Sequence, residues 1–316
     1  MDPTAAEEAL LGGRGAVWLA RDAVRVVGPD AVSYLQGQLS QDVAALAEGD
    51  STLSFVLQPT GKVDALVRVT RTGPAEVVLD TDGGFGDALV ARLQRFKLRI
   101  KADLEPLPEW RCLRVLTATP TIPAEVVAGP DSLRVPTCWP SLPGLDRLGV
   151  DPQLPDGVAL CPVEAYEAVR ILAGVPAMGA ELTERTIPAE AGIIDLAVSF
   201  TKGCYTGQEL VARIDSRGGH VPRHLRRLLA EPGPVPPAGA SVVRDGRAVG
   251  EVTSSALSAT RGAAVALGYM RRDAVSDPAS DTAGAADAAG AADAAGAAVV
   301  LRWEGGEVAA TMAPLA

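Results

Sequence analysis

The sequence predicts an α+β protein that ends in an all-β domain, and two observations carry this prediction. Strand and helix patterns alternate over most of the chain, whereas only strand patterns occur beyond residue 240. At 316 residues the chain is long enough for about two domains, or for three small ones. We therefore expect a first α+β module over residues 1–108, a second over 109–230, and a β-barrel or sandwich over 231–316.

The first module starts with two short predicted strands that meet at Arg21-Asp22. A predicted helix follows from Pro29, which suits a first helical turn. Residues 51–82 contain three β-rich runs that are separated by predicted turns at 59–61 and 73–74. A helix is expected over 83–96 and a strand over 97–107. As a strand, the last stretch would place four basic residues on one side: Arg95, Lys97, Arg99 and Lys101. A solvated strand face is the plainer interpretation of these charges.

The second module is Pro-rich up to about residue 160, with short predicted strands such as 111–117 and 132–139. A helix is predicted over 162–174, because Pro162 suits its start, Gly174 suits the position after its end, and the apolar residues between them share one face.

The third domain is preceded by a Pro-rich stretch, 231–240, that is typical of a stiff domain linker. Asp245-Gly246 then predicts a tight hairpin turn. Further strands are expected at 263–270 and 297–312. Between them, residues 279–298 form an Ala/Gly/Asp repeat that buries little apolar surface, so we expect a disordered loop.

Composition excludes several functional classes. The net charge of −10 argues against broad nucleic-acid binding, which needs a basic surface. No apolar run reaches the ~18 residues of a membrane-spanning helix, and the acidic N-terminus does not resemble a signal peptide. The four cysteines are widely spaced and form no C-x-x-C pair. We therefore expect a soluble, cytoplasmic protein without a disulfide framework, a metal site, or direct contact with nucleic acid or membrane.

The most informative stretch is TKGCYTGQELVAR, residues 201–213. Thr206 and Glu209 match a helix capping box, so Lys202 and Cys204 are expected in the loop before a helix N-terminus. Unpaired amides at such a terminus favour an anion or a thiolate. Gly203 and Gly207 would let the backbone approach a ligand closely. The alternative stays open: Cys204 packs as a small apolar residue and Lys202 is a solvated charge.

Other motifs fail on spacing. The PTGK segment has Val56 where a phosphate-binding loop needs glycine, and Val63 where it needs a hydroxyl residue. The DGGFGDA segment lacks the dinucleotide-binding spacing. The only two histidines, His220 and His224, flank a proline in a polar stretch, so we interpret them as an incidental pair rather than a metal site.

The KGCYTGQELVAR signature resembles that of the YgfZ family of folate-binding proteins, which are relatives of the glycine-cleavage T-protein and of mitochondrial iron–sulfur assembly factors. The resemblance extends to four other segments in the expected order: GPDAVSYLQGQLSQDV, LQPTGKVDALVRV, RFKLRIKADL and AGVPAMGAELTERTIPAE. It implies a T-protein-like fold, with two interlocked α+β modules and a C-terminal antiparallel β-barrel around a central cleft. It also implies that tetrahydrofolate, or another reduced folate, binds in that cleft.

The resemblance assigns roles to particular residues. Cys204 matches the family's functional thiol. By similarity to the T-protein, Glu184 or Glu190 would accept hydrogen bonds from the pterin, although either could be a surface charge. Residues around the signature complete the candidate folate site: Lys202 and Arg213 for the anionic tail, Tyr205 for stacking, and Gln208. The basic stretch 95–101 is another candidate for the tail.

Two departures from the T-protein pattern argue against transferase activity in this protein. Leu172 stands where relatives often carry an acid, and Met178 where the T-protein has a tyrosine. We therefore expect a tetrahydrofolate-binding accessory factor in iron–sulfur cluster assembly or repair, a monomer whose partners are iron–sulfur proteins or assembly factors. The alternative is a folate-dependent aminomethyl or one-carbon transferase, and the sequence leaves open whether the chain is an enzyme at all.

Overall fold

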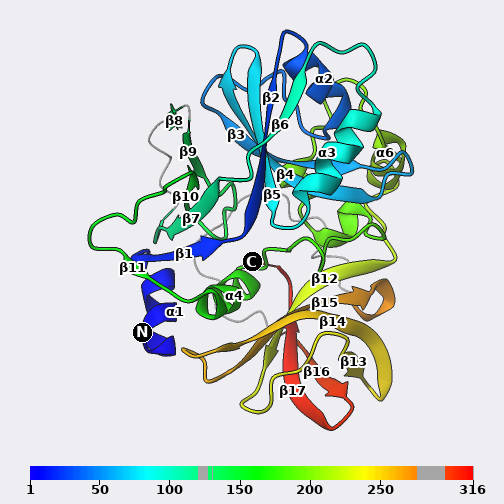
Figure 1. The fold of residues 1–316 in the computed structure, drawn as a ribbon. Helices are drawn as coiled ribbons and strands as arrows, with labels where there is room; N and C mark the ends of the chain where they lie inside the picture. The colour runs from blue at the N-terminus through cyan, green and yellow to red at the C-terminus, as the bar shows by residue number, and fades with distance from the viewer. Residues whose placement is uncertain (120–126, 130, 276–295, 316) are drawn as a thin grey trace.

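The computed structural model describes residues 1–119, 127–129, 131–275 and 296–315, and it contains two sheets and a barrel. One sheet has five strands and the other six. In Figure 1 the sheet with β3 and β4 lies at the top, the sheet with β7 and β10 at the left, and the barrel at the bottom. No helix in the described ranges is long and apolar enough to cross a membrane.

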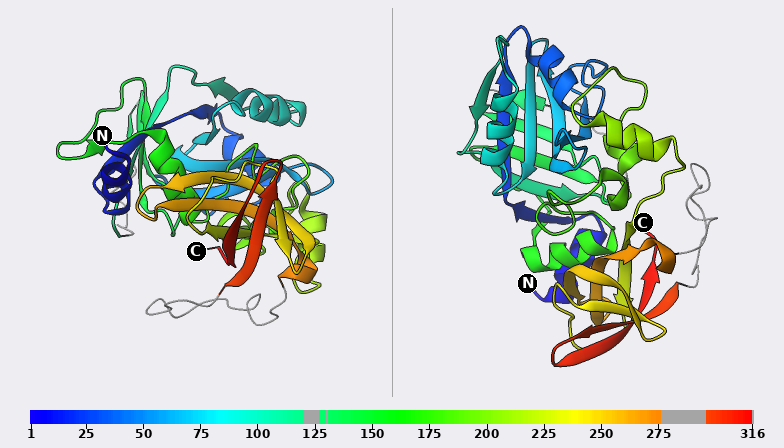
Figure 2. Two further views of the ribbon diagram at one scale, coloured as in Figure 1. Left: turned by 90° about the horizontal axis from the view of Figure 1, so that it is seen from below. Right: turned by 90° about the vertical axis from the view of Figure 1, so that its right-hand side faces the viewer.

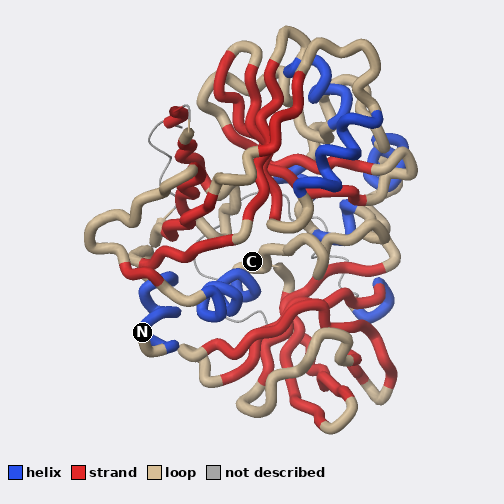
Figure 3. Tube along the Cα trace, in the orientation of Figure 1, coloured by secondary structure: helices blue, strands red, loops and turns tan. Residues whose placement is uncertain are grey.

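The five-stranded sheet forms the first module, with strand order β3-β4-β5-β2-β6. Helices α2 and α3 pack against it (Figure 3). The β-rich runs between residues 51 and 82 form β3, β4 and β5, as predicted. The bounds are β2 Arg21–Val27, α2 Ala31–Gln38, β3 Ser51–Leu57, β4 Val63–Gly73, β5 Glu76–Asp82, α3 Gly86–Arg95 and β6 Asp103–Pro106.

The six-stranded sheet joins the N-terminus to the second module, with strand order β11-β1-β7-β10-β9-β8. Only Ala20 separates β1 from β2, yet the two strands belong to different sheets, so the predicted interlocking of the two modules is confirmed. Helix α1 precedes this sheet and α4 follows it. The bounds are α1 Pro3–Leu11, β1 Gly15–Leu19, β7 Arg111–Leu116, β8 Val127–Gly129, β9 Ser132–Pro136, β10 Gly144–Gly149, β11 Ala159–Leu160 and α4 Val163–Leu172.

Three short helical segments link the second sheet to the barrel: η1 Pro188–Ala191, α5 Ile194–Ala197 and α6 Gln208–Asp215. The barrel is closed, with strand order β12-β15-β14-β13-β16-β17. It lies below the two sheets both in Figure 1 and in the right-hand view of Figure 2. Its bounds are β12 Arg223–Ala230, β13 Ser241–Arg244, β14 Arg247–Ser258, β15 Ala263–Arg271, η2 Arg272–Ala274, β16 Ala297–Trp303 and β17 Gly306–Ala313.

The hairpin prediction in the barrel is confirmed in detail. Asp245 and Gly246 join β13 to β14 with φ of 50° and 74°. Two consecutive left-handed residues are what a type I′ turn requires, and Asp-Gly is a favoured pair for it.

Three local predictions need correction. The barrel begins at Arg223, so residues 231–240 connect two barrel strands and are not a domain linker. Residues 97–102 form no strand, since Arg95 ends α3 and Arg99 is left-handed with φ of 59°, so the four basic residues do not share a strand face. The predicted disordered segment 279–298 lies mostly outside the described residues, and Ala297 and Ala298 already belong to β16.

Helix α4, here called the wedge helix, lies between the sheets and the barrel and packs against both. Tyr166 and Val169 pack into the large core shared by the two modules. Ala168 and Ile171 pack instead against barrel residues, among them Leu225. The predicted span of 162–174 is confirmed, but the single apolar face predicted for the helix is wrong, because the helix buries two faces against two different parts of the protein.

A buried carboxylate fixes α1 to the barrel. Glu7 is 1% exposed. It accepts hydrogen bonds from the Ser258 hydroxyl (2.6 Å), from the amides of Ala259 (2.6 Å) and Thr260 (3.2 Å), and from the Thr260 hydroxyl (2.8 Å). These bonds anchor α1 to the end of β14 in the barrel.

Candidate functional site

The signature loop is held on the first module by Lys202. Its ammonium donates to the carbonyls of Gln36 (2.7 Å), Leu39 (2.6 Å) and Gln41 (2.8 Å), at and just beyond the C-terminal end of α2. A cation satisfies unpaired carbonyls at a helix C-terminus and interacts favourably with the helix dipole. Burial lowers the pKa of this ammonium to about 8, against the attraction of Asp42, so it stays mainly charged at neutral pH. Lys202 is thus committed to positioning the loop.

Two glycines bring the loop against the turn between β3 and β4. Gly61 and Gly207 are left-handed, with φ of 82° and 83°. A Cβ at Gly61 would lie 2.4 Å from the Cβ of Leu210, and one at Gly207 would lie 2.4 Å from the carbonyl oxygen of Gln58. The PTGK turn and the signature loop therefore form one packed unit, and the close approach at Gly207 is to protein backbone.

The predicted capping box is wrong. Helix α6 begins at Gln208 after the left-handed Gly207, and no side chain caps it. Instead, Gln208 Oε1 accepts a hydrogen bond from the amide of Tyr205 (3.1 Å). The ring of Tyr205 is half-buried against the core, with the Lys202 ammonium 5.1 Å from its centre, and burial raises the pKa of its hydroxyl to about 12.

Cys204 is the exposed thiol of this unit. All four cysteines lie in the described part of the chain, and Cys204 is the only one that is exposed. Burial raises the pKa of Cys112, of Cys161, and of Cys138, the last to about 11. Those three are poor nucleophiles or ligands as they stand, whereas Cys204 is open to a partner.

The other predicted residues do not converge on this loop. Glu184 and Arg213 are exposed. Glu190 is 4% exposed, accepts from the Ile187 amide (3.2 Å), and pairs with Arg223 at the start of the barrel (3.0 Å). It connects η1 to β12, which is a structural role.

A cleft of about 250 Å³ opens between the two sheets and α4. Apolar walls come from Phe85, Trp139 and Met178, and polar groups come from Asp82 and Glu167. None of the seven residues predicted from the sequence lines it. Of the two T-protein-related positions noted above, Met178 lines the cleft, whereas Leu172 packs toward the barrel.

Buried arginines form the floor of the cleft. Arg68 on β4 pairs with Asp80 on β5 (2.9 Å) and, across the gap between the sheets, with Asp146 on β10 (2.7 Å). Arg114 on β7 pairs with both oxygens of Asp146 (2.7 and 2.8 Å) and donates to the Tyr166 hydroxyl on α4 (2.5 Å). The network thus links the first sheet, the second sheet and the wedge helix.

The network holds its charges despite burial. Burial alone would raise the pKa of Asp146, but Arg114 and Arg68 lower it well below its ordinary value. Burial would likewise lower the pKa of Arg68, but Asp80 and Asp146 raise it. Arg21 extends the chain to Asp80 (2.5 Å) and Asp82 (2.8 Å). Three arginines thus face three aspartates, and the cluster is electrically balanced.

The rim of the cleft is tied to the barrel through Glu181. This carboxylate is fully buried and accepts from the Ala177 amide (2.9 Å), Arg170 (3.3 Å), and the hydroxyls of Thr253 and Ser254 (2.6 Å each). Arg170 also makes a two-pronged pair with Glu167. No sequence motif marks these groups, because their partners lie on other strands and on α4; charged residues also stand at Asp64 and Arg71 of β4 and at Arg147 of β10, so a charge within a strand does not single out Arg68 or Asp146.

The described residues contain no group of three or more His, Cys, Asp or Glu side chains that could hold a metal ion. His224 lines a separate groove beside α6 and the start of the barrel.

Comparisons with known proteins place this geometry in context. Residues 223–315 match the model of the glycine cleavage T-protein C-terminal barrel domain. The chain is 30% identical over 233 residues to a tRNA-modifying protein YgfZ from Pectobacterium carotovorum subsp. carotovorum, covering 68% of this chain and 69% of that protein. It is 29% identical over 247 residues to the mouse mitochondrial iron–sulfur cluster assembly factor IBA57, covering 70% and 67% of the two chains.

A solved structure shows that the fold is T-protein-like. The aminomethyltransferase T of the glycine cleavage system from Bartonella henselae superposes with a TM-score of 0.80, covering 99% of this chain and 88% of that one. Its sequence identity is 18%, so the likeness shows a T-protein-like fold and nothing finer.

Asp146→Asn tests the network through pH. At neutral pH the variant should lose about 3–5 kcal/mol of unfolding free energy, because the buried Arg114 loses its carboxylate partner and Arg68 keeps only Asp80. The pKa of Asp146 is lowered by folding, so its stabilisation is present above an unfolded value of about 3.9 and is lost below it. In urea unfolding, the gap between wild type and variant should therefore narrow by up to ~1.4 kcal/mol per pH unit below that value. Asp156→Asn, at an exposed carboxylate, is the control. A difference in unfolding free energy between wild type and Asp146→Asn that stays the same at all pH values would contradict the assignment of Asp146 as a charged member of the network.

Proposed function

The chain belongs to the YgfZ family, and from this premise we propose that it is a tetrahydrofolate-binding accessory factor in iron–sulfur cluster assembly or repair, with Cys204 as its working thiol. The observation that carries the proposal is the pairing of two features: one exposed thiol on a rigidly positioned loop, and a ligand-sized cleft between the two modules. Relatives named as a cluster assembly factor and as tRNA-modifying proteins support the biological setting. We further propose that it acts in the cytoplasm, as a monomer, on iron–sulfur proteins or assembly factors.

The cleft suits the pterin end of a reduced folate. Ligand pockets are mostly apolar with a few well-placed polar groups, and Phe85, Trp139 and Met178 supply surfaces against which a flat ring can pack. Pterin N–H groups need acceptors, and Asp82 and Glu167 are carboxylates on the cleft wall. At about 250 Å³, just below the usual range for ligand pockets, the cleft accommodates the ring system rather than the whole molecule.

Glu167 replaces the acid that position 172 lacks. Both residues lie on α4, but Leu172 packs toward the barrel while Glu167 faces the cleft. Its side chain is 39% exposed, and although Arg170 binds both oxygens, a carboxylate offers about four acceptor positions. We therefore assign the pterin-binding role to Glu167 in place of Glu184 or Glu190.

The thiol's chemistry depends on a partner. An iron–sulfur cluster is usually held by about four thiolates, so Cys204 alone cannot hold one. A cluster passing through this protein as cargo needs ligands from a partner protein or from a small thiol. The exposed position of Cys204, on a loop that Lys202 ties to α2, allows such an approach.

A folate-dependent aminomethyl or one-carbon transferase is the second candidate, favoured by the T-protein-like fold. Transfer chemistry needs a carboxylate at the cleft that is free to move a proton. Asp82 is paired with Arg21 (2.8 Å) and accepts from the Met178 amide (2.9 Å). Glu167 is paired with Arg170, so both cleft carboxylates are stabilised as hydrogen-bond acceptors rather than as groups that take up a proton. The accessory role therefore fits the site better.

Calorimetric titration with tetrahydrofolate tests the cleft assignment. Glu167→Gln should weaken binding at least about tenfold, because a buried pterin donor loses a charged acceptor worth roughly 1.5–3 kcal/mol. Glu184→Gln, at an exposed carboxylate away from the cleft, is the matched control and should bind like wild type. The opposite ranking, with Glu184→Gln the weaker binder, would restore the assignment suggested by the T-protein.

Complementation tests the thiol independently of folate. In a strain that lacks this protein and has low iron–sulfur enzyme activity, Cys204→Ala should fail to restore that activity, since no other exposed thiol can substitute. Cys138→Ala removes a thiol whose pKa burial raises to about 11 and should restore it. Full restoration by Cys204→Ala would refute the role of the thiol.

A further inference from the structure

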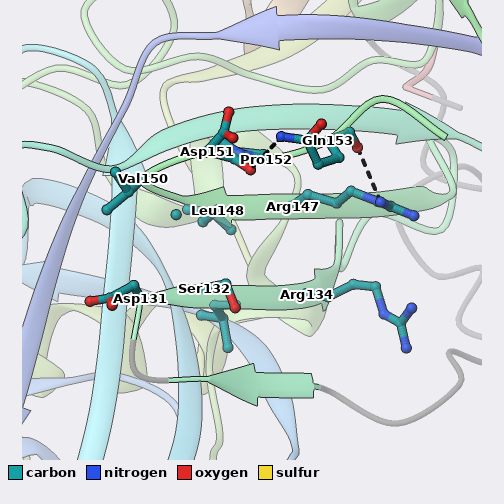
Figure 4. A pocket seen from close by; sticks show the side chains of 11 residues that line it. Asp131, Ser132, Arg134, Arg147, Leu148, Val150, Asp151, Pro152 and Gln153 are labelled. Carbon is teal, nitrogen blue, oxygen red and sulfur yellow. Dashed lines mark hydrogen bonds between the residues drawn. The ribbon is translucent and has the colours of Figure 1, made fainter.

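A second pocket, of about 500 Å³, lies on the second module between β9, β10 and the segment after β10. Figure 4 shows its polar side chains separated by charge: the arginines Arg134 and Arg147 extend toward one end, and Asp131 lies at the other. This volume is well within the range of small-molecule sites.

The two arginines are direct neighbours across the sheet. Arg134 on β9 and Arg147 on β10 are partners in the strand register, so both side chains stand on the same face. Like charges directly opposite each other on neighbouring strands are destabilising. The fully buried Arg68 and Arg114 pair with carboxylates, whereas Arg134 and Arg147 are partly buried. Within the described ranges, neither Arg134 nor Arg147 has such a partner.

An unsatisfied donor lies at the same place. The Nε of Arg134 is buried without a hydrogen-bond partner in the described structure. Arg147 donates from Nη1 to the carbonyl of Gln153 (3.1 Å), which holds it against the pocket wall and leaves its other donors available. Buried donors in native proteins are nearly always satisfied, by protein, water or an ion.

We propose that this pocket binds the phosphate or carboxylate group of a small organic molecule, with the anionic group held between Arg134 and Arg147. Guanidinium groups bind such oxyanions through two parallel hydrogen bonds, and an anion between them would remove the repulsion and satisfy the buried Nε. The pocket is larger than the anionic group alone requires. Asp131 and Asp151, farther along it, would repel a second anion and accept from amine or hydroxyl groups on the rest of the molecule.

The second pocket is separate from the folate cleft. Successive residues of a strand face opposite sides of a sheet. Asp146 on β10 therefore faces the network at the floor of the cleft, and Arg147 faces the opposite side. The sheet lies between the two sites, so an anion can bind in the second pocket whether or not folate occupies the cleft.

Calorimetry at low ionic strength tests the proposal with two probes, glycerol 3-phosphate for the phosphate source and succinate for the carboxylate source. At least one should bind, and Arg134→Gln and Arg147→Gln should each weaken that probe at least about tenfold. Arg302→Gln removes the same charge from an exposed barrel pair with Glu307 and should leave binding within about twofold of wild type. Whichever probe binds more tightly identifies the anionic group.

The proposal is overturned if neither probe binds up to about 10 mM. It is also overturned if Arg302→Gln weakens binding equally, which would indicate only a response to net charge. If Arg134→Gln fails to fold, Arg134→Lys keeps the charge without the two-pronged geometry and should still weaken binding. An Arg134→Lys variant that binds as wild type does would also contradict the assigned geometry.

Discussion

Arg68 is the residue on which the arrangement of the two modules depends. Its side chain projects from β4 of the first sheet and is 1% exposed. It pairs with Asp80 of the same sheet and with Asp146 of the facing sheet. Removing one partner from such a buried pair costs roughly 3–5 kcal/mol, a large part of the stability of a typical domain. Because charge-assisted pairs need good geometry, Arg68 fixes the distance between the sheets more narrowly than apolar packing alone.

The distance between the two sheets sets the width of the cleft between them. Arg114 passes the constraint from Asp146 to Tyr166, and so to α4, which forms the third wall. Glu181 then connects the cleft rim to the barrel through Thr253 and Ser254. Three parts of the chain that are far apart in sequence are thereby held around one cavity, whereas the thiol-bearing loop is fixed separately through Lys202 and α2.

The local features of this fold are predictable from the sequence, whereas contacts between distant residues are not. The Asp245-Gly246 turn and the span of α4 are predictable because their signals lie within a few residues, whereas the second buried face of α4 depends on contact with the barrel. The capping box failed because Gly207 adopts a left-handed conformation that its contact with the PTGK turn demands, and that contact joins residues far apart in the chain. The cleft residues were missed for the same reason: the partners of Arg68 are identified only once two sheets face each other.

The central claim is that the cavity floored by Arg68, rather than the loop that carries Cys204, receives the folate. Hydrogen exchange with and without tetrahydrofolate tests this most directly, since ligand contact slows the opening of nearby backbone. If the folate lies in this cavity, exchange should slow at residues 83–85 and at Ala177 and Met178, with 201–207 unchanged. Protection confined to 201–207 would contradict it and place the folate beside the thiol.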